Sequence, residues 1–425
     1  MVAGGRSALA GAMTSRAFRI LPATLAIGAL LAAPMSAFAL SQPSLAESAV
    51  TQATVHAPRG ALVSAVEIAN LTAAELDAAA ADRGFVDAPK ARYDVTVHRL
   101  IYRTIDTKGR PTTASGIVVL PNGRRGALPV AEYLHGTMGT KAYAASVDAD
   151  STDRLITALF AGAGLAGVAP DYLGLGLGPG RHPYLDTATE TSASTDMLLA
   201  ARAFSARRGV ALKRDVLVTG FSQGGRATLG VGRALQAGAA GPFRLGSLHA
   251  VASPFDLLKV QLPAVFDGGV RPQIATLYLA YFITSWNRTV GLYDVPSEVF
   301  QAPYADRVEE LLDGTHTTEE IMQGLPDSPA KLFTADYLSQ LQNPTGPLRQ
   351  AMRAADQICH DWSPRVPLHF YSGAKDTDVR AANSEVCATG LRSRGARVDV
   401  RSMGAVDHFG TAMTAYPQIV RAATR

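Results

Sequence analysis

The chain has 425 residues, of which 47% are hydrophobic, 18% charged and 7% aromatic, which excludes a disordered, collagen-like or coiled-coil protein. The formal charge of +4 arises mainly in the first 39 residues, which hold three arginines and no acid; removing these three from 40 basic residues leaves 37 against 36 acidic ones. With this balance and no basic stripe elsewhere, we expect no nucleic acid partner.

The first 39 residues have the pattern of a secretory signal peptide. Arg16 and Arg19 precede a soft apolar run over residues 20–34, and an A-x-A cleavage signature ends at Ala39. The run is 15 residues long, which is short of the roughly 20 that a membrane-spanning helix needs. We therefore expect cleavage near Ala39 and a secreted protein, extracellular or periplasmic.

An antiparallel hairpin opens the regular part of the chain. An Ala-rich leader from residue 40 and a short helix over 73–81 come first. Two segments of alternating polarity, 93–105 and 111–120, are then joined by the turn sequence Asp-Thr-Lys-Gly.

Beyond the hairpin, short apolar strands alternate with amphipathic helices. The expected strands are 128–134, 165–170, 216–219, 248–252, 367–371 and 398–402, and the expected helices are 152–163, 190–207, 226–236, 382–394 and 410–423. This alternation predicts the α/β class, with a mostly parallel sheet covered by helices on both faces.

One interval breaks the alternation. Residues 256–365 place 110 helix-rich, proline-punctuated positions between two sheet strands, where a normal connection has a few residues. We interpret them as a helical cap, or lid, inserted into a domain made of residues 40–255 and 366–425. An irregular surface excursion is the alternative.

The chain has two cysteines, Cys359 and Cys387. In an oxidising compartment an even number without a CxxC spacing favours a disulfide over a metal or redox site. The bond would close a loop of 28 positions and contribute roughly 3–4 kcal/mol. The alternative is a pair of buried free thiols.

A G-x-S-x-G motif centred on Ser222 lies between a predicted strand and a predicted helix. This context is that of a nucleophile elbow, where Gly220 and Gly224 let the two backbones pass closely. We expect Ser222 to project from a strained turn into solvent above the sheet, next to a helix N-terminus that favours negative charge.

A serine hydroxyl needs a base, and in this fold the order along the chain is serine, acid, histidine. His408 follows the last strand and precedes the terminal helix, where the base belongs. His249 and His369 lie inside apolar strands and are interpreted as core or edge residues, whereas His316 and His360 precede the acid.

The acid is expected in the loop after strand 367–371, which offers Asp376 and Asp378. We favour Asp376, three residues after a glycine, to hold the imidazole tautomer. Asp378 is interpreted as an exposed loop charge. For the oxyanion hole we expect the backbone N–H groups of Gln223, which follows the nucleophile, and of Thr137, with Met138 as an alternative.

With these motifs placed, the chain resembles the secreted lipases and esterases of the α/β-hydrolase fold, both the yeast secretory lipases and the exported lipase/esterases of bacterial plant pathogens. The resemblance rests on the stretches 171–176, 182–185, 220–225 and 376–379 and runs from about residue 92 to the end. It implies a triad of Ser222, Asp376 and His408 and a lid over an acyl pocket.

The sequence thus predicts a secreted serine carboxylic-ester hydrolase that acts on acyl esters, triacylglycerols and other lipidic esters included. It implies no metal or organic cofactor, a monomer, and a small-molecule or lipid ester as substrate. The apolar stretch 274–283 fits a transient lipid-interface contact and core packing equally well. A peptidase or an acyltransferase on the same scaffold is the first alternative, and an inactive secreted binding protein the second.

Overall fold

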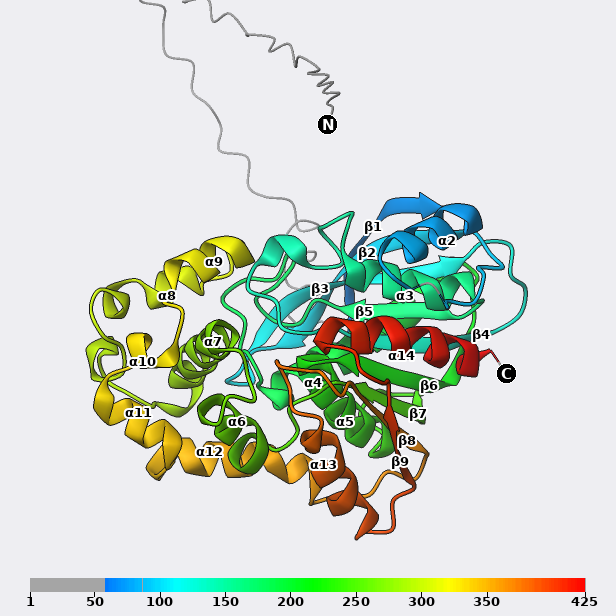
Figure 1. The fold of residues 1–425 in the computed structure, drawn as a ribbon. Helices are drawn as coiled ribbons and strands as arrows, with labels where there is room; N and C mark the ends of the chain where they lie inside the picture. The colour runs from blue at the N-terminus through cyan, green and yellow to red at the C-terminus, as the bar shows by residue number, and fades with distance from the viewer. Residues whose placement is uncertain (1–57, 86, 425) are drawn as a thin grey trace, which may run out of the picture. The chain divides into compact units, whose positions relative to one another are not determined.

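The computed structural model describes residues 58–85 and 87–424. The predicted signal peptide and its cleavage site near Ala39 lie outside the described residues. Within these residues, nine strands form one sheet in the order β1-β2-β3-β5-β4-β6-β7-β8-β9 (Figure 1). The strands are β1 (Leu62–Leu71), β2 (Val95–Ile105), β3 (Pro111–Pro121), β4 (Leu128–Leu134), β5 (Ala166–Pro170), β6 (Leu212–Phe221), β7 (Arg244–Val251), β8 (Leu368–Ser372) and β9 (Val398–Ser402).

The sheet is antiparallel at one edge and parallel over the rest. Strands β1, β2, β3 and β5 pair antiparallel, and every pair from β5 to β9 is parallel. This order, with helices on both faces, is the α/β-hydrolase arrangement, so the predicted fold class is confirmed.

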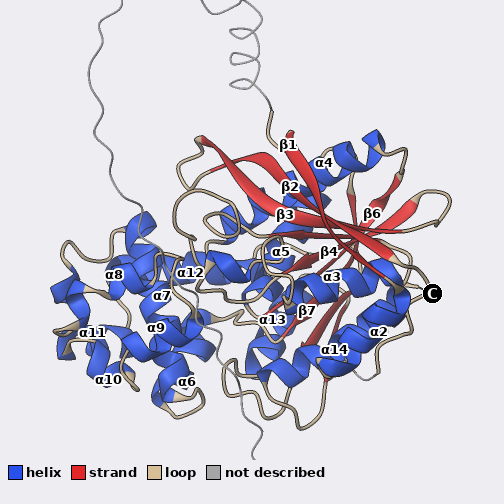
Figure 2. Cartoon of the chain, turned by 90° about the horizontal axis from the view of Figure 1, so that it is seen from above, coloured by secondary structure: helices blue, strands red, loops and turns tan. Residues whose placement is uncertain are grey.

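Helices cover both faces of the sheet (Figure 2). One face is covered by α2 (Ala73–Asp82), α3 (Thr152–Gly162) and α14 (His408–Ala423), and the other by α4 (Thr187–Arg207), α5 (Gln223–Gln236) and α13 (Ala382–Arg392). The apolar residues of each strand divide between two separate hydrophobic clusters, as expected for a sheet that is buried on both faces.

Strand β1 was not predicted. It lies within the Ala-rich leader and most of its side chains are exposed, so it shows no apolar alternation. Strand β1 lies at the edge of the sheet and is held there by antiparallel backbone hydrogen bonds with β2. Backbone pairing of this kind leaves no pattern in the sequence.

The connection between β7 and β8 is helical, as predicted for residues 256–365, which we call the insert. Its elements are the π-helical turn η2 (Leu257–Gln261), the helices α6 (Leu262–Phe266), α7 (Pro272–Val290), α8 (Val308–Leu311), α9 (Thr318–Gly324), α10 (Pro329–Leu332), α11 (Ala335–Gln342) and α12 (Gly346–Asp356), and the 3-10 turns η3 (Pro296–Glu298), η4 (Tyr304–Asp306) and η5 (Gln357–Cys359).

The insert has a hydrophobic cluster of its own, which includes Phe282, Trp286, Phe300 and Phe333 and takes in Tyr184 from the loop before α4. Its apolar helix α7 therefore packs inside the insert. Among the described residues, no helix is both long and apolar enough to cross a membrane.

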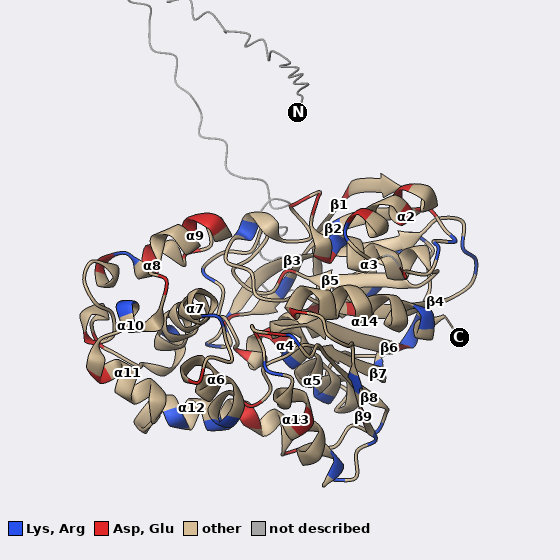
Figure 3. Cartoon of the chain, in the orientation of Figure 1, with Lys and Arg blue, Asp and Glu red and all other residues tan. Residues whose placement is uncertain are grey.

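Charged residues of both signs are spread over the described chain, with acidic side chains on α9 and basic ones on α12 (Figure 3). Ion pairs join the end of the insert to α5, between Arg233 and Asp361 at 2.6 Å, and its beginning to the loop after β8, between Asp267 and Arg380 at 2.5 Å. The predicted disulfide is confirmed: Cys359 of η5 is bonded to Cys387 of α13, with Cα atoms 4.9 Å apart. The insert is thus fastened at both of its ends.

Candidate active site

Ser222 occupies a sharp turn between β6 and α5. Its backbone has φ +54° and ψ −119°, a conformation that a non-glycine residue adopts only under constraint. A Cβ at Gly220 would overlap the carbonyl of Gly224, and one at Gly224 would overlap the carbonyl of Leu134. Helix α5 begins at Gln223, three residues earlier than predicted, so the serine lies directly at its N-terminus. The local geometry is that of the expected elbow.

The surroundings of Ser222 differ from the expectation of a solvent-exposed side chain. Ser222 is only 4% exposed, because the insert covers the carboxyl edge of the sheet. The residue instead lies where two cavities meet.

His408 and Asp376 are in direct contact. The imidazole Nδ1 lies 2.8 Å from Asp376 Oδ2, and both side chains are buried. The other carboxylate oxygen of Asp376 accepts the backbone N–H groups of Asp378 (2.9 Å) and Val379 (2.8 Å). The two backbone bonds to Oδ1 therefore fix the carboxylate with Oδ2 turned toward the ring.

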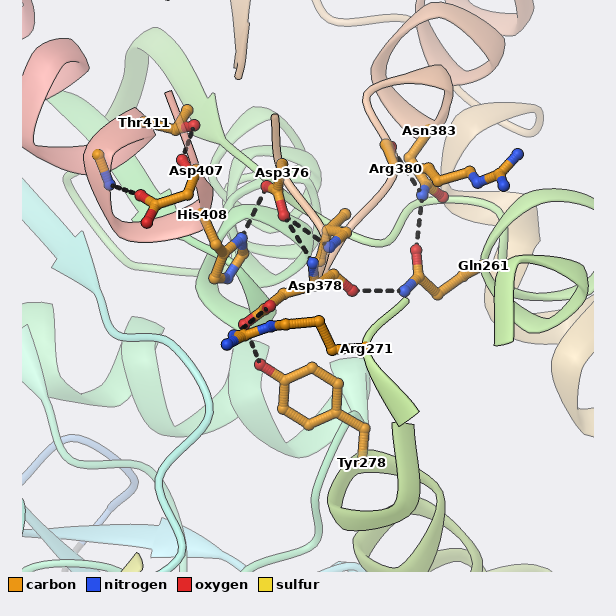
Figure 4. Close-up of polar contacts among 12 residues, drawn as sticks. Gln261, Arg271, Tyr278, Asp376, Asp378, Arg380, Asn383, Asp407, His408 and Thr411 are labelled. Carbon is orange, nitrogen blue, oxygen red and sulfur yellow. Dashed lines mark hydrogen bonds and ion pairs between the residues drawn. The ribbon is translucent and has the colours of Figure 1, made fainter. Parts of the chain in front are cut away.

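Helix α14 fixes the position of His408. Asp407 caps the helix by accepting the backbone N–H of Gly410 at 2.8 Å, and its carbonyl accepts the Thr411 hydroxyl at 2.7 Å (Figure 4). The ring of Phe221, next to the serine, packs 4.6 Å from the imidazole. Ser222 and His408 line one cavity, so the described structure brings the three predicted residues together at the carboxyl edge of the sheet.

The interpretation of Asp378 as an exposed charge was wrong. Its side chain is 3% exposed and forms an ion pair of 2.7 Å with Arg271, while the Tyr278 hydroxyl lies 3.4 Å from its second oxygen (Figure 4). Both partners belong to the insert. A buried carboxylate requires such partners, and sequence spacing gives no sign of one more than 100 positions away.

Backbone and amide contacts reinforce this junction. The amide of Gln261 donates to the carbonyl of Asp378 at 2.8 Å, and the backbone N–H of Arg271 donates to the carbonyl of Thr377 at 3.1 Å. Asn383 donates to the Gln261 side chain at 2.9 Å (Figure 4). The beginning of the insert and the loop that bears Asp376 are therefore one hydrogen-bonded unit.

The residues predicted for the oxyanion hole lie beside the elbow. A Cβ at Gly136 would approach the Ser222 Cβ to 3.3 Å, and the next residue, Thr137, lines both cavities together with Ser222. The carbonyl of the alternative, Met138, accepts the hydroxyl of Tyr281 at 3.2 Å. Among the described residues that line the two cavities, Thr137 is present and Met138 is not, which favours Thr137.

A buried hydrogen-bond cluster, which sequence reasoning missed, holds the side chain of Gln223. Its amide donates to His182 Nε2 at 2.8 Å and to Glu190 Oε1 at 2.6 Å. His182 Nδ1 faces the Leu173 carbonyl at 3.0 Å, so the ring carries its proton there and accepts from Gln223. In the sequence, the one sign of this cluster was the stretch 182–185, which contributes to the resemblance to lipases and esterases.

Burial keeps the cluster neutral. Desolvation lowers the pKa of His182 to about 3 and raises the pKa of Glu190 to about 8. A neutral imidazole and a neutral carboxyl are the forms that a dry site tolerates. The cluster thus orients Gln223 without placing a charge behind the proposed oxyanion.

Two of the histidines that we did not assign to catalysis lie in the sheet, and a third lies in the insert. His249 is buried against His369, with ring centroids 5.0 Å apart, and burial lowers its pKa to about 3. His316 pairs with Asp313 in the insert, 3.5 Å away. Among the described residues, no group of three or more His, Cys, Asp or Glu side chains could hold a metal ion.

Two cavities meet at Ser222 and share Thr137 and Tyr278. Cavity A contains about 610 Å³ of empty space, lies against the insert, and has walls that include Leu185, Leu257, Leu262, Val265, Leu279 and Met352. Cavity B contains about 720 Å³, lies against α3 and α14, and has walls that include Phe85, Tyr133, Phe221, His408, Phe409 and Met413. The site therefore offers two distinct spaces for the two halves of a substrate.

Comparison with solved structures finds close matches in shape. A protein assigned as a hydrolase from Legionella pneumophila is 25% identical, with a TM-score of 0.79, over 86% of this chain and 98% of that one. The rice cell wall degrading esterase LipA from Xanthomonas oryzae is 27% identical, with a TM-score of 0.75, over 86% and 97%. Candida antarctica lipase A in its closed state, at 12% identity and a TM-score of 0.62 over 86% and 82%, shares the fold.

No protein-family model and no curated protein matches the sequence. The assignment of this chain to the α/β-hydrolase fold therefore rests on the strand order, the elbow and the structural neighbours together. On this evidence the chain has the α/β-hydrolase fold and is a carboxylic ester hydrolase.

Proposed function

We propose that this ester hydrolase is a serine enzyme that works through an acyl-enzyme, with Ser222 as nucleophile, His408 as general base and acid, and Asp376 as the group that orients the imidazole. The observation that carries the proposal is the 2.8 Å bond between His408 and Asp376 beside a cavity that also contains the strained elbow serine. The esterase among the structural neighbours supports it.

The chemistry follows from the atoms available. Because Nδ1 of His408 faces Asp376, Nε2 is free to take the proton from the Ser222 hydroxyl as its oxygen attacks the ester carbonyl. The backbone N–H groups of Thr137 and Gln223 stabilise the tetrahedral oxyanion, and each such donor contributes about 10²–10³ in rate. His408 then protonates the leaving alcohol, and a water activated by the same ring releases the acid.

The insert, residues 256–365, acts in this proposal as a cap over the site. Residues of the insert, most of them apolar, form most of the lining of cavity A, which suits an acyl chain rather than a charged group. The disulfide agrees with a protein exported to an oxidising compartment. Secretion after removal of residues 1–39 is part of the proposal.

The test is Ser222→Ala. We expect the variant to fold and to lose p-nitrophenyl butyrate hydrolysis, because the hydroxyl is the only group of Ser222 that can form the acyl-enzyme. The matched control is Ser205→Ala, which removes the hydroxyl of an equally buried serine in α4 and should leave the rate unchanged. Unchanged turnover in Ser222→Ala would refute the assignment.

A fluorophosphonate probe reports the nucleophile independently of any substrate. We expect mass spectrometry to find the phosphonyl group on Ser222 in the wild type and to find no labelling in Ser222→Ala. Comparing an ester with the matched amide then separates an esterase from the peptidase alternative.

A further inference from the structure

The two cavities that meet at Ser222 differ in which catalytic group they contain. His408 lines cavity B and is absent from the described residues that line cavity A. Since Asp376 occupies Nδ1 of the ring, only the Nε2 side can deliver a proton to a leaving oxygen. The alcohol oxygen of an ester must reach that nitrogen, and the acyl carbon chain must then point the other way.

The chemistry of the walls also differs. Branched aliphatic side chains are the most numerous residues lining cavity A, which also has the rings of Tyr184, Tyr278 and Phe282 in its walls. Cavity B has four aromatic side chains that cavity A lacks, Phe85, Tyr133, Phe221 and Phe409, beside a smaller number of aliphatic residues such as Ile156 and Met413. Aliphatic walls accommodate a flexible chain, whereas rings pack best against another flat ring.

Phe409 is the most informative residue of cavity B. It follows the catalytic histidine directly and is 58% exposed, although its ring lines the cavity. Its centroid lies 5.6 Å from the His408 ring and 5.8 Å from the Phe221 ring. A large apolar side chain left exposed beside reacting atoms offers an unoccupied stacking face.

We propose that cavity B is the alcohol-binding subsite and that it takes the ring of an aryl-bearing alcohol, with Phe409 as the stacking platform. The proposal deepens the proposed function and rests on it. The substrate class is then an ester with a flexible acyl chain in cavity A and an aromatic alcohol in cavity B.

The first test compares ethyl, cyclohexylmethyl and benzyl butyrate. All three form the same butyryl-enzyme, so kcat/KM, divided by the hydroxide-catalysed rate of each ester, reports the alcohol half alone. In the wild type we expect benzyl butyrate to exceed cyclohexylmethyl butyrate by about 3–10-fold, the range of one aromatic pair.

Phe409→Ala should lower the ratio of benzyl to cyclohexylmethyl butyrate to about one, while the conservative Phe409→Tyr should keep the preference. A displacement of His408 would slow all three esters together and leave their ratios unchanged, so the ratios separate it from the loss of stacking. A wild type without benzyl preference, or a Phe409→Ala enzyme that keeps it, would overturn the subsite.

A pair of variants separates the two cavities. Met413 lines only cavity B and Val265 only cavity A, and both are half-buried, so each position can accept a larger side chain. Met413→Trp should lower the ratio of benzyl to ethyl butyrate about tenfold and leave the octanoate-to-acetate ratio of ethyl esters unchanged. Val265→Trp should lower the octanoate-to-acetate ratio of ethyl esters about tenfold and leave the ratio of benzyl to ethyl butyrate unchanged.

If each variant altered both ratios, the assignment of halves to cavities would be wrong. Failure of the proposed function looks different: the wild type would then hydrolyse none of these esters, or Ser222→Ala would hydrolyse them as well as the wild type.

Discussion

The acid side and the oxyanion side of the catalytic centre are stabilised in different ways. On the acid side, Asp378 lies two residues after Asp376 and pairs with Arg271, whose side chain is 58% exposed. On the oxyanion side, Gln223 is held by His182 and Glu190, all three buried. One support is an ion pair that reaches solvent, and the other is a neutral cluster inside the protein.

The difference shows which part of the chain each half depends on. The partners of the acid loop come from the insert, so the position of Asp376 is tied to the cap. The partners of Gln223 come from α4 and the loop before it, which belong to the sheet domain. Changes in the insert should therefore act on the acid, and changes in α4 on the oxyanion hole.

The largest effect is expected from Asp376→Asn. The amide keeps the shape of the carboxylate but favours the wrong imidazole tautomer and cannot stabilise the imidazolium, a change that costs about 10⁴ in kcat. Steady-state kinetics with p-nitrophenyl butyrate measure it. A loss of tenfold or less would mean that another carboxylate supports His408.

Local motifs explain what could be predicted from the sequence. The elbow, the strand alternation and the position of His408 before α14 each depend on residues that are neighbours in the chain. The partners of Asp378 and Gln223 come from segments far away in sequence, and a contact such as Arg271 with Asp378 leaves no periodicity. The burial of Ser222 was unforeseen for the same reason, since the insert that covers it is distant in the chain.

The oxyanion side should respond to pH through Glu190. Burial raises its pKa to about 8, above the 4.5 of the unfolded chain, so the folded state keeps a proton that the unfolded state releases. The contribution of Glu190 to stability is therefore complete below about pH 4.5, falls as the pH rises toward 8, and is constant above.

Glu190→Gln removes this titration while its carbonyl can still accept the amide of Gln223. We expect denaturant unfolding from pH 5 to 9 to show that the free energy of unfolding of the variant rises relative to that of the wild type. The rise should continue up to about pH 8 and amount to a few kcal/mol at most. A difference that is independent of pH would show that Glu190 is ionised in the folded protein.

The smallest effect is expected where the insert holds the acid loop. Asp378→Asn keeps the hydrogen-bonding shape of the side chain but removes its charge, so Arg271 loses its ion pair and the loop that bears Asp376 becomes less constrained. We expect kcat to fall about tenfold with KM nearly unchanged, since an orienting group acts in the transition state rather than in binding.

The matched control is Arg380→Ala, which breaks the other ion pair between the same two segments, that with Asp267 at 2.5 Å. Asp267 is exposed, Arg380 is half-buried, and the carboxylate of Asp376 bonds to neither, so kcat should change little. If instead both variants lowered kcat equally, the insert would stabilise the loop as a whole. A loss confined to Asp378→Asn, accompanied by a shifted pH profile of kcat/KM, would show that the insert acts on the catalytic acid through that one carboxylate.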